Sequence, residues 1–416
     1  MNLKMKAILI IADGMADRPI KELNWKTPLE IAHKPSLNMI AKTGVCGIMD
    51  LISPGIPPGS DAATLALLGY DALKVYSGRG ALEAIGSGLE VFAGDVAFRC
   101  NFATVNEKRI VLDRRAGRIS NEDAAQLTRS LEKVKLKQSH VKFTFKNTIQ
   151  HRAVLVLHGS KLSTAVSDSD PGKTGMKASE IKPLDKSPEA KQTANIVNEL
   201  MNKFRKVLEA HPINKKRIES KMPTANFILC RGAGKAPNIK PLPQVYGVKG
   251  TCIGAAALVK GVCKVAGLDL TCVKGATGTP QTDFMAKAKA TVQALEANDF
   301  VILHVKAMDV VSHDGDYKQK IELIEKFDKM ISHILDDVDL DVTYIAVTAD
   351  HTTSCITRDH EGDPVPVAIT GPQVRRDDVM KFDERACSKG GLNRIRGMDI
   401  MPILMNFIGK SKKFGA

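Results

Sequence analysis

The chain has 416 residues, of which 44% are hydrophobic and 25% are charged, and its formal net charge is +14. This composition excludes a wholly disordered protein and, at about 150 residues per domain, indicates two or three compact units. Eight cysteines without a C-x-x-C spacing do not support a disulfide scaffold or a structural zinc site, so we expect reduced thiols in a cytoplasmic protein.

The excess of positive charge is compatible with solubility, nucleic acid, anionic membranes or small phosphorylated substrates. Basic residues cluster at 203–217 and 410–413, where Phe204 is the one aromatic residue, and the chain has one Trp and five Tyr. A platform for stacking bases is therefore poorly supplied. The N-terminal apolar run at 7–12 is too short for a signal peptide or a membrane span. We expect no nucleic-acid partner and no membrane association.

The first 70 residues predict a strand and, later, a loop that leads into a helix. Residues 7–12 are an apolar, β-branched run that ends at Asp13. The sequence PPGSD at 57–61 precedes a run of Ala and Leu that stops at Gly69, which is typical of a loop followed by a helix. Ser60 would lie at the helix N-terminus. There it is either an ordinary N-cap or, beside a metal ion, an activated hydroxyl that faces a phosphate.

The middle of the chain, roughly 90–238, differs in composition from its flanks. Its expected elements are two strands, a long polar loop and a helix, at 141–145, 153–157, 167–192 and near 188–210. The shift predicts that residues 87–239 form a smaller inserted α/β domain. Residues 1–86 and 240–416 would then form one discontinuous domain.

The C-terminal part predicts strands that end near acidic residues. Two apolar runs, 300–305 and 342–349, precede Asp309 and the pair Asp350-His351. Helices are expected at 251–267, from its small residues, and at 316–338, from its amphipathic stripe. Mostly apolar strands separated by helices indicate a parallel-rich α/β sheet sandwiched by helices, with its chemistry at the carboxyl ends of the strands.

Acidic and histidine side chains gather at these predicted strand ends. They are Asp13, Asp309, His313, Asp350, His351 and His360. Carboxylates with imidazoles suit Mn²⁺, Zn²⁺ or Fe, whereas carboxylates with waters suit Mg²⁺. Six ligands exceed one four-coordinate site and indicate two metal ions about 4 Å apart. The alternative is that each Asp caps a loop and each His lies on the surface.

In their order along the chain, these segments resemble the archaeal-type cofactor-independent phosphoglycerate mutases of the alkaline phosphatase superfamily. The resemblance covers essentially the full chain. The matching segments are IADGMADR (11–18), PPGSDAATLALLGYD (57–71), GRGALEAIG (78–86), DVAFRCNFAT (95–104), HRAVLVL and VSDSDP (within 151–171), YGVKG (246–250), KAMDVVSHDGD (306–316) and TADHTTSCITRDHEGDPVPV (348–367). Ser312 departs from the pattern, which has Gly before His313.

The resemblance implies an alkaline-phosphatase-like fold and a ligand set for two divalent metal ions. One ion would be bound by Asp13, Ser60, Asp350 and His351, and the other by Asp309, His313 and His360. Ser60 would be the serine that is transiently phosphorylated. We favour Mn²⁺ and leave Mg²⁺, Co²⁺ and Zn²⁺ open; no bisphosphoglycerate cofactor is implied. We do not expect Ser312 to abolish metal binding.

The inserted domain is expected to hold the glycerate. Transfer requires Arg or Lys for the carboxylate and phosphate, and a carboxylate or His to move hydroxyl protons. The candidates are Arg115, Arg118, Arg152, Asp168 and Asp170, together with Lys249 of YGVKG in the other domain, which resembles a substrate-contacting lysine. Arg152 and Asp168 are the candidates for a part in the transfer itself. For each Arg, a solvated surface charge is the alternative.

The implied activity is the interconversion of 3-phosphoglycerate and 2-phosphoglycerate, in glycolysis and gluconeogenesis, through a phosphoserine intermediate. A metal-dependent phosphatase, or a phosphotransferase acting on another small phosphorylated acid, is the alternative on the same scaffold. A basic nucleic-acid-binding protein is the non-enzymatic alternative. A sulfatase is disfavoured because residues 59–63 lack the C/S-x-P-x-R context. The oligomeric state stays open.

Overall fold

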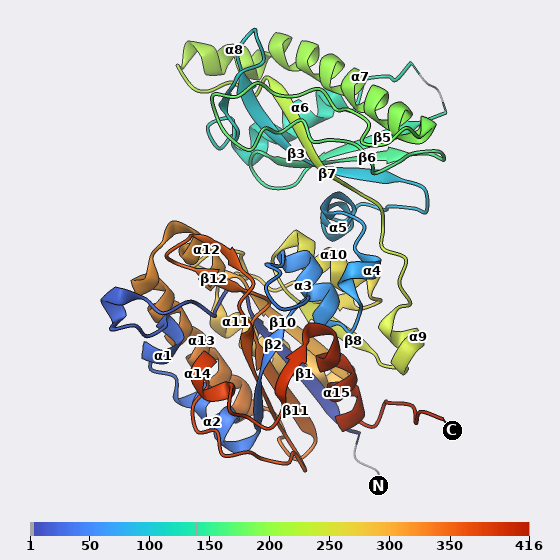
Figure 1. Ribbon diagram of the computed structural model, residues 1–416. Helices are drawn as coiled ribbons and strands as arrows, with labels where there is room; N and C mark the ends of the chain where they lie inside the picture. The colour runs from blue at the N-terminus through green and yellow to red at the C-terminus, as the bar shows by residue number, and fades with distance from the viewer. Residues whose placement is uncertain (1–3, 138–139, 416) are drawn as a thin grey trace. The chain divides into compact units, whose positions relative to one another are not determined.

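Figure 1 shows the computed structural model of the chain, which describes residues 4–137 and 140–415. It divides into two compact units. The discontinuous unit comprises Met1–Tyr76 and Asn238–Ala416, and the inserted unit comprises Ser77–Pro237. The outer limits expected for the domains, residues 1 and 416, lie outside the described residues. The first internal boundary lies at 76/77, ten residues before the expected one, and the second lies at 237/238.

Helix α5 (Arg79–Gly86) explains the earlier first boundary. Its residues Ala81 and Ala84 pack against Ala97, Val154 and Val156 of the inserted unit. The helix can approach this closely because a Cβ at Gly80 would lie only 2.1 Å from the carbonyl oxygen of Ala97. The glycine-rich sequence GRGALEAIG is therefore a packing motif of the inserted unit.

The discontinuous unit is built on one eight-stranded sheet. Its strands, in spatial order, are β15 (Asn393–Arg396), β2 (Val45–Asp50), β14 (Val365–Thr370), β11 (Thr343–Thr348), β1 (Lys6–Ala12), β10 (Phe300–Val305), β8 (Gly250–Ile253) and β9 (Asp269–Leu270). All pair in parallel except β14, which runs antiparallel to both of its neighbours. The expected parallel-rich α/β class is confirmed.

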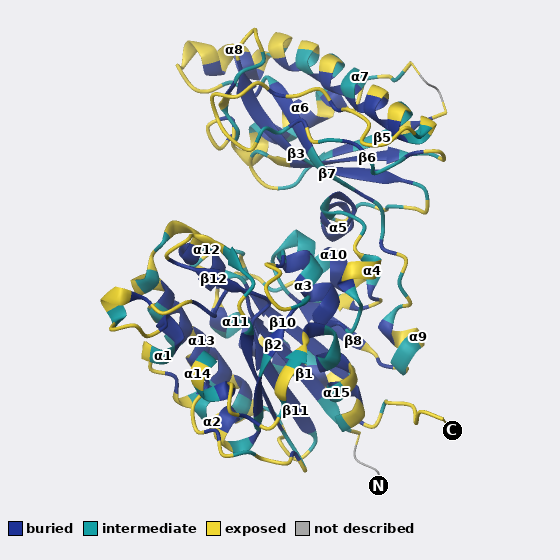
Figure 2. Ribbon diagram, in the orientation of Figure 1, coloured by how far each residue is buried: buried dark blue, intermediate teal, exposed yellow. Residues whose placement is uncertain are grey.

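The three apolar runs singled out in the sequence form adjacent strands. They are β10, β1 and β11, with β1 in the middle. Every residue of β10 and β11 is buried, as Figure 2 shows for the centre of the sheet. Strands buried on both faces are continuously apolar because helices cover both sides.

The helices of this unit lie on the two faces of the sheet (Figure 1). On one face α13 (Tyr317–Asp337) contacts α11 (Phe284–Ala297), α1 (Pro28–Ile31), α2 (Pro35–Thr43) and α12 (Ala307–Asp314). On the other face α3 (Ser60–Leu67) contacts α10 (Ala257–Val265) and the 3₁₀ turn Gly397–Asp399, which leads into α15 (Ile400–Phe407). The shorter elements are a 3₁₀ turn at Lys21–Leu23, α4 (Ala72–Val75), α9 (Leu242–Tyr246), α14 (Glu384–Cys387), β12 (Thr352–Ser354) and β13 (Asp359–Glu361).

Of two helices predicted in this unit, one is confirmed and the other is wrong in part. The amphipathic stripe at 316–338 is confirmed as α13, which begins after the N-cap Asp316. The helix expected over 251–267 is wrong in its first part, because Gly250–Ile253 form β8 and α10 begins only at Ala257. Thr251, Cys252 and Ile253 pair with β10, and this sheet pairing outweighs the small-residue pattern.

The inserted unit contains an antiparallel sheet. Strands β5 (Lys142–Asn147), β6 (Arg152–His158), β3 (Val96–Val105) and β7 (Phe227–Gly234) lie in that order, and β4 (Val111–Asp113) pairs with the end of β3. Its other helices are α6 (Asn121–Leu131), α7 (Pro188–Ala210) and α8 (Pro212–Glu219). The strands expected at 141–145 and 153–157 and the helix near 188–210 are confirmed.

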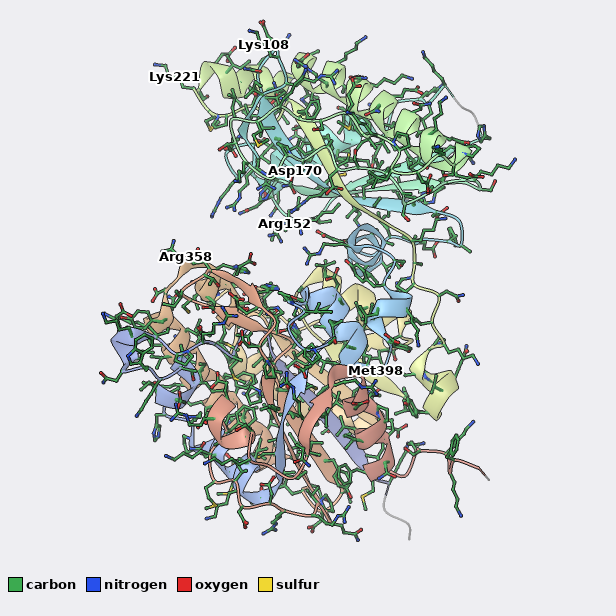
Figure 3. All side chains as sticks on the ribbon, in the orientation of Figure 1. Lys108, Arg152, Asp170, Lys221, Arg358 and Met398 are labelled. Carbon is green, nitrogen blue, oxygen red and sulfur yellow. The ribbon has the colours of Figure 1, made fainter. Side chains whose placement is uncertain are left out.

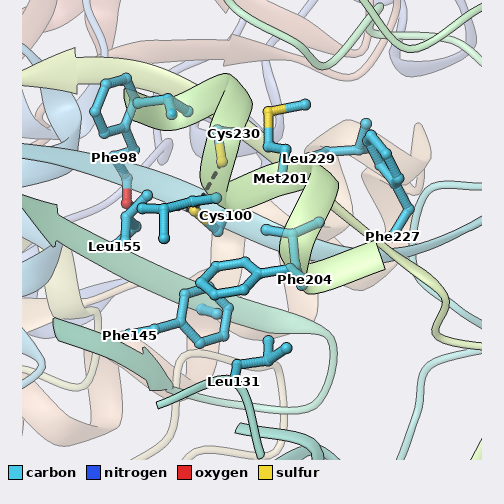
Figure 4. Packing of buried hydrophobic residues seen from close by; sticks show 14 of the residues in the cluster. Phe98, Cys100, Leu131, Phe145, Leu155, Met201, Phe204, Phe227, Leu229 and Cys230 are labelled. Carbon is cyan, nitrogen blue, oxygen red and sulfur yellow. Dashed lines mark hydrogen bonds between the residues drawn. The ribbon is translucent and has the colours of Figure 1, made fainter. Parts of the chain in front are cut away.

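The core of the inserted unit joins its sheet to α6 and α7. Figure 4 shows Phe145 of β5 packed against Phe204 of α7, with ring centroids 5.2 Å apart. Phe102 of β3 meets Phe145 edge to face at 5.9 Å. Edge-to-face aromatic pairs add stability beyond the apolar area they bury, so the unit has a hydrophobic core of its own.

Across residues 4–137 and 140–415, no helix combines the length and the apolar character needed to cross a bilayer.

Candidate active site

The carboxyl ends of β1, β10 and β11 meet at one edge of the eight-stranded sheet. Asp13 directly follows β1, and Asp350-His351 follow β11 after one residue. Asp309 and His313 lie one turn apart in α12, the helix after β10. Since these three strands are neighbours, the topology alone brings their terminal side chains together.

The first group is formed by Asp13, Asp350, His351 and Ser60, all buried. His351 Nε2 lies 3.3 Å from Asp13 Oδ1, 3.5 Å from Asp350 Oδ2 and 3.2 Å from Ser60 Oγ. The backbone N–H of Gly14 donates to the other Asp350 oxygen, Oδ1, at 3.2 Å.

The second group is formed by Asp309, His313 and His360. Both imidazole Nε2 atoms lie 3.3 Å from Asp309 Oδ1. The rings of His351 and His360 stack with centroids 3.7 Å apart, so the two groups adjoin. His351 also lies within metal-ligand reach of Asp309 and His360. The structure thus brings together all seven residues expected to bind metal.

In each of the three histidines of these two groups, Nδ1 is held by an oxygen, which leaves Nε2 facing a carboxylate. His360 Nδ1–H donates to the Pro58 carbonyl at 2.7 Å, and His313 Nδ1–H to the Arg358 carbonyl at 2.8 Å. His351 Nδ1 pairs with Thr353 Oγ1 at 2.8 Å, and that hydroxyl donates to Asp309 Oδ1 at 3.1 Å. Such contacts orient metal-binding histidines and fix the tautomer with a free Nε2.

Unpartnered oxygens also fit a bound cation. Asp13 Oδ1 and Asp350 Oδ2 are buried without a hydrogen-bond partner in the described part of the chain. Buried carboxylate oxygens without a partner are costly, and both face His351 Nε2. The donor set of carboxylates, imidazoles and a hydroxyl therefore fits divalent metal ions.

Ser60 is the first residue of α3, and Gly59 rather than Ser60 is the N-cap. No side chain caps this helix, so the Ser60 hydroxyl is not used for capping. The interpretation of Ser60 as an ordinary N-cap is therefore wrong. Its Oγ instead faces His351, at a helix end whose first N–H groups favour anions.

Lys306, which directly follows β10, was missed in the sequence. Its Nζ lies 3.0 Å from Asp13 Oδ2 and 2.7 Å from Asp309 Oδ2. Burial would lower the pKa of Lys306, but the charges of Asp13 and Asp309 outweigh burial and raise it above its ordinary value. The ammonium group thus joins one carboxylate of each group. A lysine one residue beyond an apolar strand was the available signal.

The second group is strongly polarised. Burial alone would raise the pKa of Asp309, but hydrogen bonds with His313 and His360 outweigh it and hold that pKa well below its ordinary range. The same interaction raises the pKa of His313 to about 9. A metal ion binds an imidazole nitrogen only when that nitrogen carries no proton. To bind a metal ion, His313 and His360 would therefore have to lose the proton from Nε2.

Ser312 stands in the position where Gly was expected. It is buried in α12, and its hydroxyl donates to the Met308 carbonyl at 2.9 Å, one turn earlier in the same helix. The extra hydroxyl is thus satisfied by the helix backbone.

The inserted unit gathers guanidinium groups around Asp170, which Figure 3 labels together with Arg152. Arg114 donates two hydrogen bonds to the Asp170 carboxylate, at 2.9 and 2.7 Å, and Arg231 lies 3.6 Å from it. Arg114 and Arg231 were missed, although Arg114 adjoins the predicted Arg115. Asp170 is therefore already paired.

The other predicted residues of this unit are exposed. Asp168 accepts a hydrogen bond from the Gly232 backbone at one oxygen, Oδ1. Arg152 opens β6, and partial desolvation together with the charges of Arg99 and Arg115 lowers its pKa. Arg118 lies on a turn with a φ of +53°. Burial and the charges of Arg152 and Arg115 lower the pKa of His151 to about 4.

Lys249 is not brought to the carboxylate cluster. It precedes β8, whose first residue, Gly250, pairs with Phe300 at the start of β10. Its backbone N–H donates to Asp299 Oδ2 at 3.0 Å. At about 3.3 Å per residue, the length of β10 separates the two ends of the sheet by roughly 17 Å. Lys249 therefore lies at the opposite end of β10 from the carboxylates, and its substrate contact stays a prediction.

Comparisons with known proteins agree with one family. The family model for 2,3-bisphosphoglycerate-independent phosphoglycerate mutase matches residues 41–214. The curated mutase 1 of that name from Methanocaldococcus jannaschii is 49% identical, over 99% of this chain and all of its own length. The one from Pyrococcus horikoshii is 48% identical, with both chains fully covered.

Two solved structures extend the agreement to the fold. A protein from Pyrococcus horikoshii superposes with a TM-score of 0.87 at 42% identity, with both chains fully covered. The cofactor-independent phosphoglycerate mutase of Thermoplasma acidophilum gives 0.71 at 34% identity, over 97% of this chain and all of that one. On these likenesses, the chain belongs to the 2,3-bisphosphoglycerate-independent phosphoglycerate mutase family.

Proposed function

We propose that this chain interconverts 3-phosphoglycerate and 2-phosphoglycerate by passing the phosphoryl group through Ser60. The observation that carries the proposal is the contact of Ser60 Oγ with His351 Nε2, at 3.2 Å, inside two adjoining carboxylate–imidazole groups. Membership of a mutase family supports it over a phosphatase on the same scaffold. We place the reaction in cytoplasmic glycolysis and gluconeogenesis.

Two divalent ions, for which we favour Mn²⁺, would be held at the two groups. Asp13, Ser60, Asp350 and His351 would bind one, and Asp309, His313 and His360 the other. When bound, the ions supply positive charge that lowers the pKa of the Ser60 hydroxyl and offsets the charge of the phosphoryl oxygens. Bisphosphoglycerate is not required as a cofactor, because Ser60 itself carries the phosphoryl group between the two halves of the reaction.

Ser60 acts as the nucleophile. A bond forms between its Oγ and the phosphorus while the bond from phosphorus to the 3-hydroxyl oxygen of the glycerate breaks. The 2-hydroxyl oxygen then attacks the same phosphorus and releases Ser60. The N-terminus of α3 favours the anionic group in both halves of the reaction. Lys306 adds a fixed positive charge between Asp13 and Asp309.

The inserted unit would bind the glycerate. Arg115, Arg118 and Arg152 offer guanidinium groups for the carboxylate and phosphate, since paired N–H groups fit these anions. Asp168 keeps one oxygen, Oδ2, free of the Gly232 hydrogen bond and would move the hydroxyl protons of the glycerate. Asp170 would instead orient Arg114 and Arg231.

An enolase-coupled assay with 3-phosphoglycerate tests the proposal. Turnover should vanish in EDTA and return with added Mn²⁺, without any bisphosphoglycerate. Inorganic phosphate should be measured in the same reaction. Metal-dependent phosphate release without 2-phosphoglycerate would replace the proposal with a phosphatase. Salt-dependent binding of RNA or DNA without turnover would favour the non-enzymatic alternative.

A further inference from the structure

His304 is a buried histidine beside Asp13 that the proposed metal groups leave out. It is the fifth residue of β10, and only 1% of its surface is exposed. Neither of its ring nitrogens has a hydrogen-bond partner in the described part of the chain. A buried ring with two unpartnered nitrogens is costly in an otherwise apolar strand. Packing alone would be served better by an aliphatic residue.

The ring of His304 faces the first metal group. Its Nε2 lies 3.3 Å from Asp13 Oδ2 and 3.8 Å from Asp350 Oδ2. Its backbone is fixed as well, because the buried Lys287 donates from Nζ to the His304 carbonyl at 2.6 Å. The strand and this bond therefore hold the ring close to Asp13.

The two oxygens of Asp13 have different surroundings. Oδ2 faces His304 Nε2 and accepts a hydrogen bond from Lys306 Nζ at 3.0 Å. Oδ1 has no hydrogen-bond partner and faces His351 Nε2 at 3.3 Å. Protein groups thus gather at Oδ2, and Oδ1 is left for a cation.

We propose that His304 is a positioning residue that donates Nε2–H to Asp13 Oδ2 and thereby turns Oδ1 toward the first metal ion. A separation of 3.3 Å needs only a small rotation of the ring or the carboxylate to become a hydrogen bond. Hydrogen bonds to the outer oxygen of a ligating carboxylate fix its orientation and sustain metal affinity. The inference rests on the proposed metal role of Asp13.

The test uses the full chain, stripped of metal with EDTA, and two amide variants of matched chemistry. In His304→Gln the amide nitrogen falls near the place of Nε2 and can reach Asp13 Oδ2. In His304→Asn it falls near Nδ1 and cannot. We expect His304→Asn to weaken one Mn²⁺ equivalent about 10- to 100-fold in calorimetric titration, and His304→Gln to restore most of that loss.

His304→Leu supplies a second readout. It removes the buried Nδ1, which has no partner in the described part of the chain, together with the proposed donor Nε2–H. The metal-free variant should therefore unfold close to the temperature of the parent, although it binds Mn²⁺ more weakly. Ile302→Val on the same strand is the control, since it should lower the unfolding temperature without changing Mn²⁺ affinity. His360→Gln should weaken the other equivalent.

Equal Mn²⁺ affinities in the Gln and Asn variants would overturn the proposal, whether both match the parent or both are weak. An altered visible absorption spectrum of bound Co²⁺ in His304→Gln would overturn it too, because it would make His304 a direct ligand. If the unaltered chain bound no Mn²⁺, the proposed metal groups themselves would fail.

Discussion

The two units of the chain differ in the charged side chains that they gather. In the discontinuous unit, carboxylates and imidazoles crowd together at the ends of parallel strands, most of them buried, with Lys306 between Asp13 and Asp309. In the inserted unit, guanidinium groups gather around Asp170 and along the start of β6, and Arg152, Asp168 and Arg118 are exposed. One unit suits cations and the other suits anions.

The difference in burial affects how firmly the side chains of each unit are held in place. Buried charged groups must have partners, so each side chain of the metal groups is fixed by at least one neighbour, as His360 is by the Pro58 carbonyl. Exposed arginines are held less tightly and can adapt to a ligand. This difference agrees with the proposal that the phosphoryl group is transferred at the buried cluster and that the exposed arginines bind the glycerate.

Replacing Ser60 is expected to have the largest effect. Ser60→Ala should reduce mutase turnover more than about 1,000-fold and abolish the phosphoenzyme, because no other oxygen takes its place. The unfolding temperature should stay near that of the parent, since Gly59 rather than Ser60 caps α3. The measurements are the coupled assay and mass spectrometry of the intact chain. A variant that kept a tenth of the activity would exclude Ser60 as the nucleophile.

Replacing Asp309 tests whether the discontinuous unit binds the metal ions. Asp309→Asn should bind one Mn²⁺ instead of two and lose at least about 100-fold in activity, since His313 and His360 lose their shared carboxylate oxygen. Metal content after gel filtration and the coupled assay measure the two effects. Asp314→Asn, an exposed position in the same helix, is the control. Two retained equivalents would show that Asp309 is not a ligand.

Replacing Arg152 tests whether the inserted unit binds the anionic substrate. Arg152→Ala should lower kcat/KM about 10- to 100-fold through misplaced substrate, with Mn²⁺ stoichiometry unchanged. Arg129→Ala, an exposed arginine of α6 outside the cluster, should leave both quantities as they are. The two properties need to be measured on the same preparation. Metal loss in the Arg152 variant would contradict the assignment of separate tasks.

Glu384 gives a smaller, pH-dependent effect within the discontinuous unit. Its oxygens accept hydrogen bonds from the Asp17 backbone and the Thr27 hydroxyl, and burial raises its pKa from 4.5 to about 7. Between these values the folded chain holds a proton that the unfolded chain releases, so the contribution of Glu384 to stability falls as pH rises from 4.5 to 7. Glu384→Gln removes this dependence. Its unfolding temperature relative to the parent should therefore be higher at pH 8 than at pH 5, and a constant difference would contradict the raised pKa.

The sequence predicted that the candidate metal ligands would gather at one edge of the sheet, because most of them follow strands. Asp13 and Asp350 follow apolar runs that indicated buried parallel strands, and parallel strands share one carboxyl edge. This reasoning did not identify His304, because a histidine inside an apolar run is simply taken as part of the strand. The direction of its side chain depends on how the strand pairs, which the sequence does not show. The sequence did not show which end of the sheet Lys249 occupies, because the strand that follows it, β8, was expected to be part of a helix.

The inserted unit was harder to predict at the level of contacts. Its strands and α7 were visible from alternation and amphipathic pattern. The pairing of Asp170 with Arg114 was not, because it joins a long loop to the turn after β4, and no local pattern encodes such a contact. A pairing over this distance in the sequence depends on tertiary geometry alone.

The position of β1 at the centre of its sheet also governs the order in which the chain can fold during synthesis. The two neighbours of β1 are β10 and β11, which lie within residues 300–348. Nearly three hundred further residues are therefore synthesised after β1 before either neighbour exists. The inserted unit is complete by residue 237 and can fold on its own core in the meantime. Until β10 and β11 have been made, the apolar β1 has no strand partner and is exposed to aggregation. The proposed ligand His360 joins the site only near the end of translation.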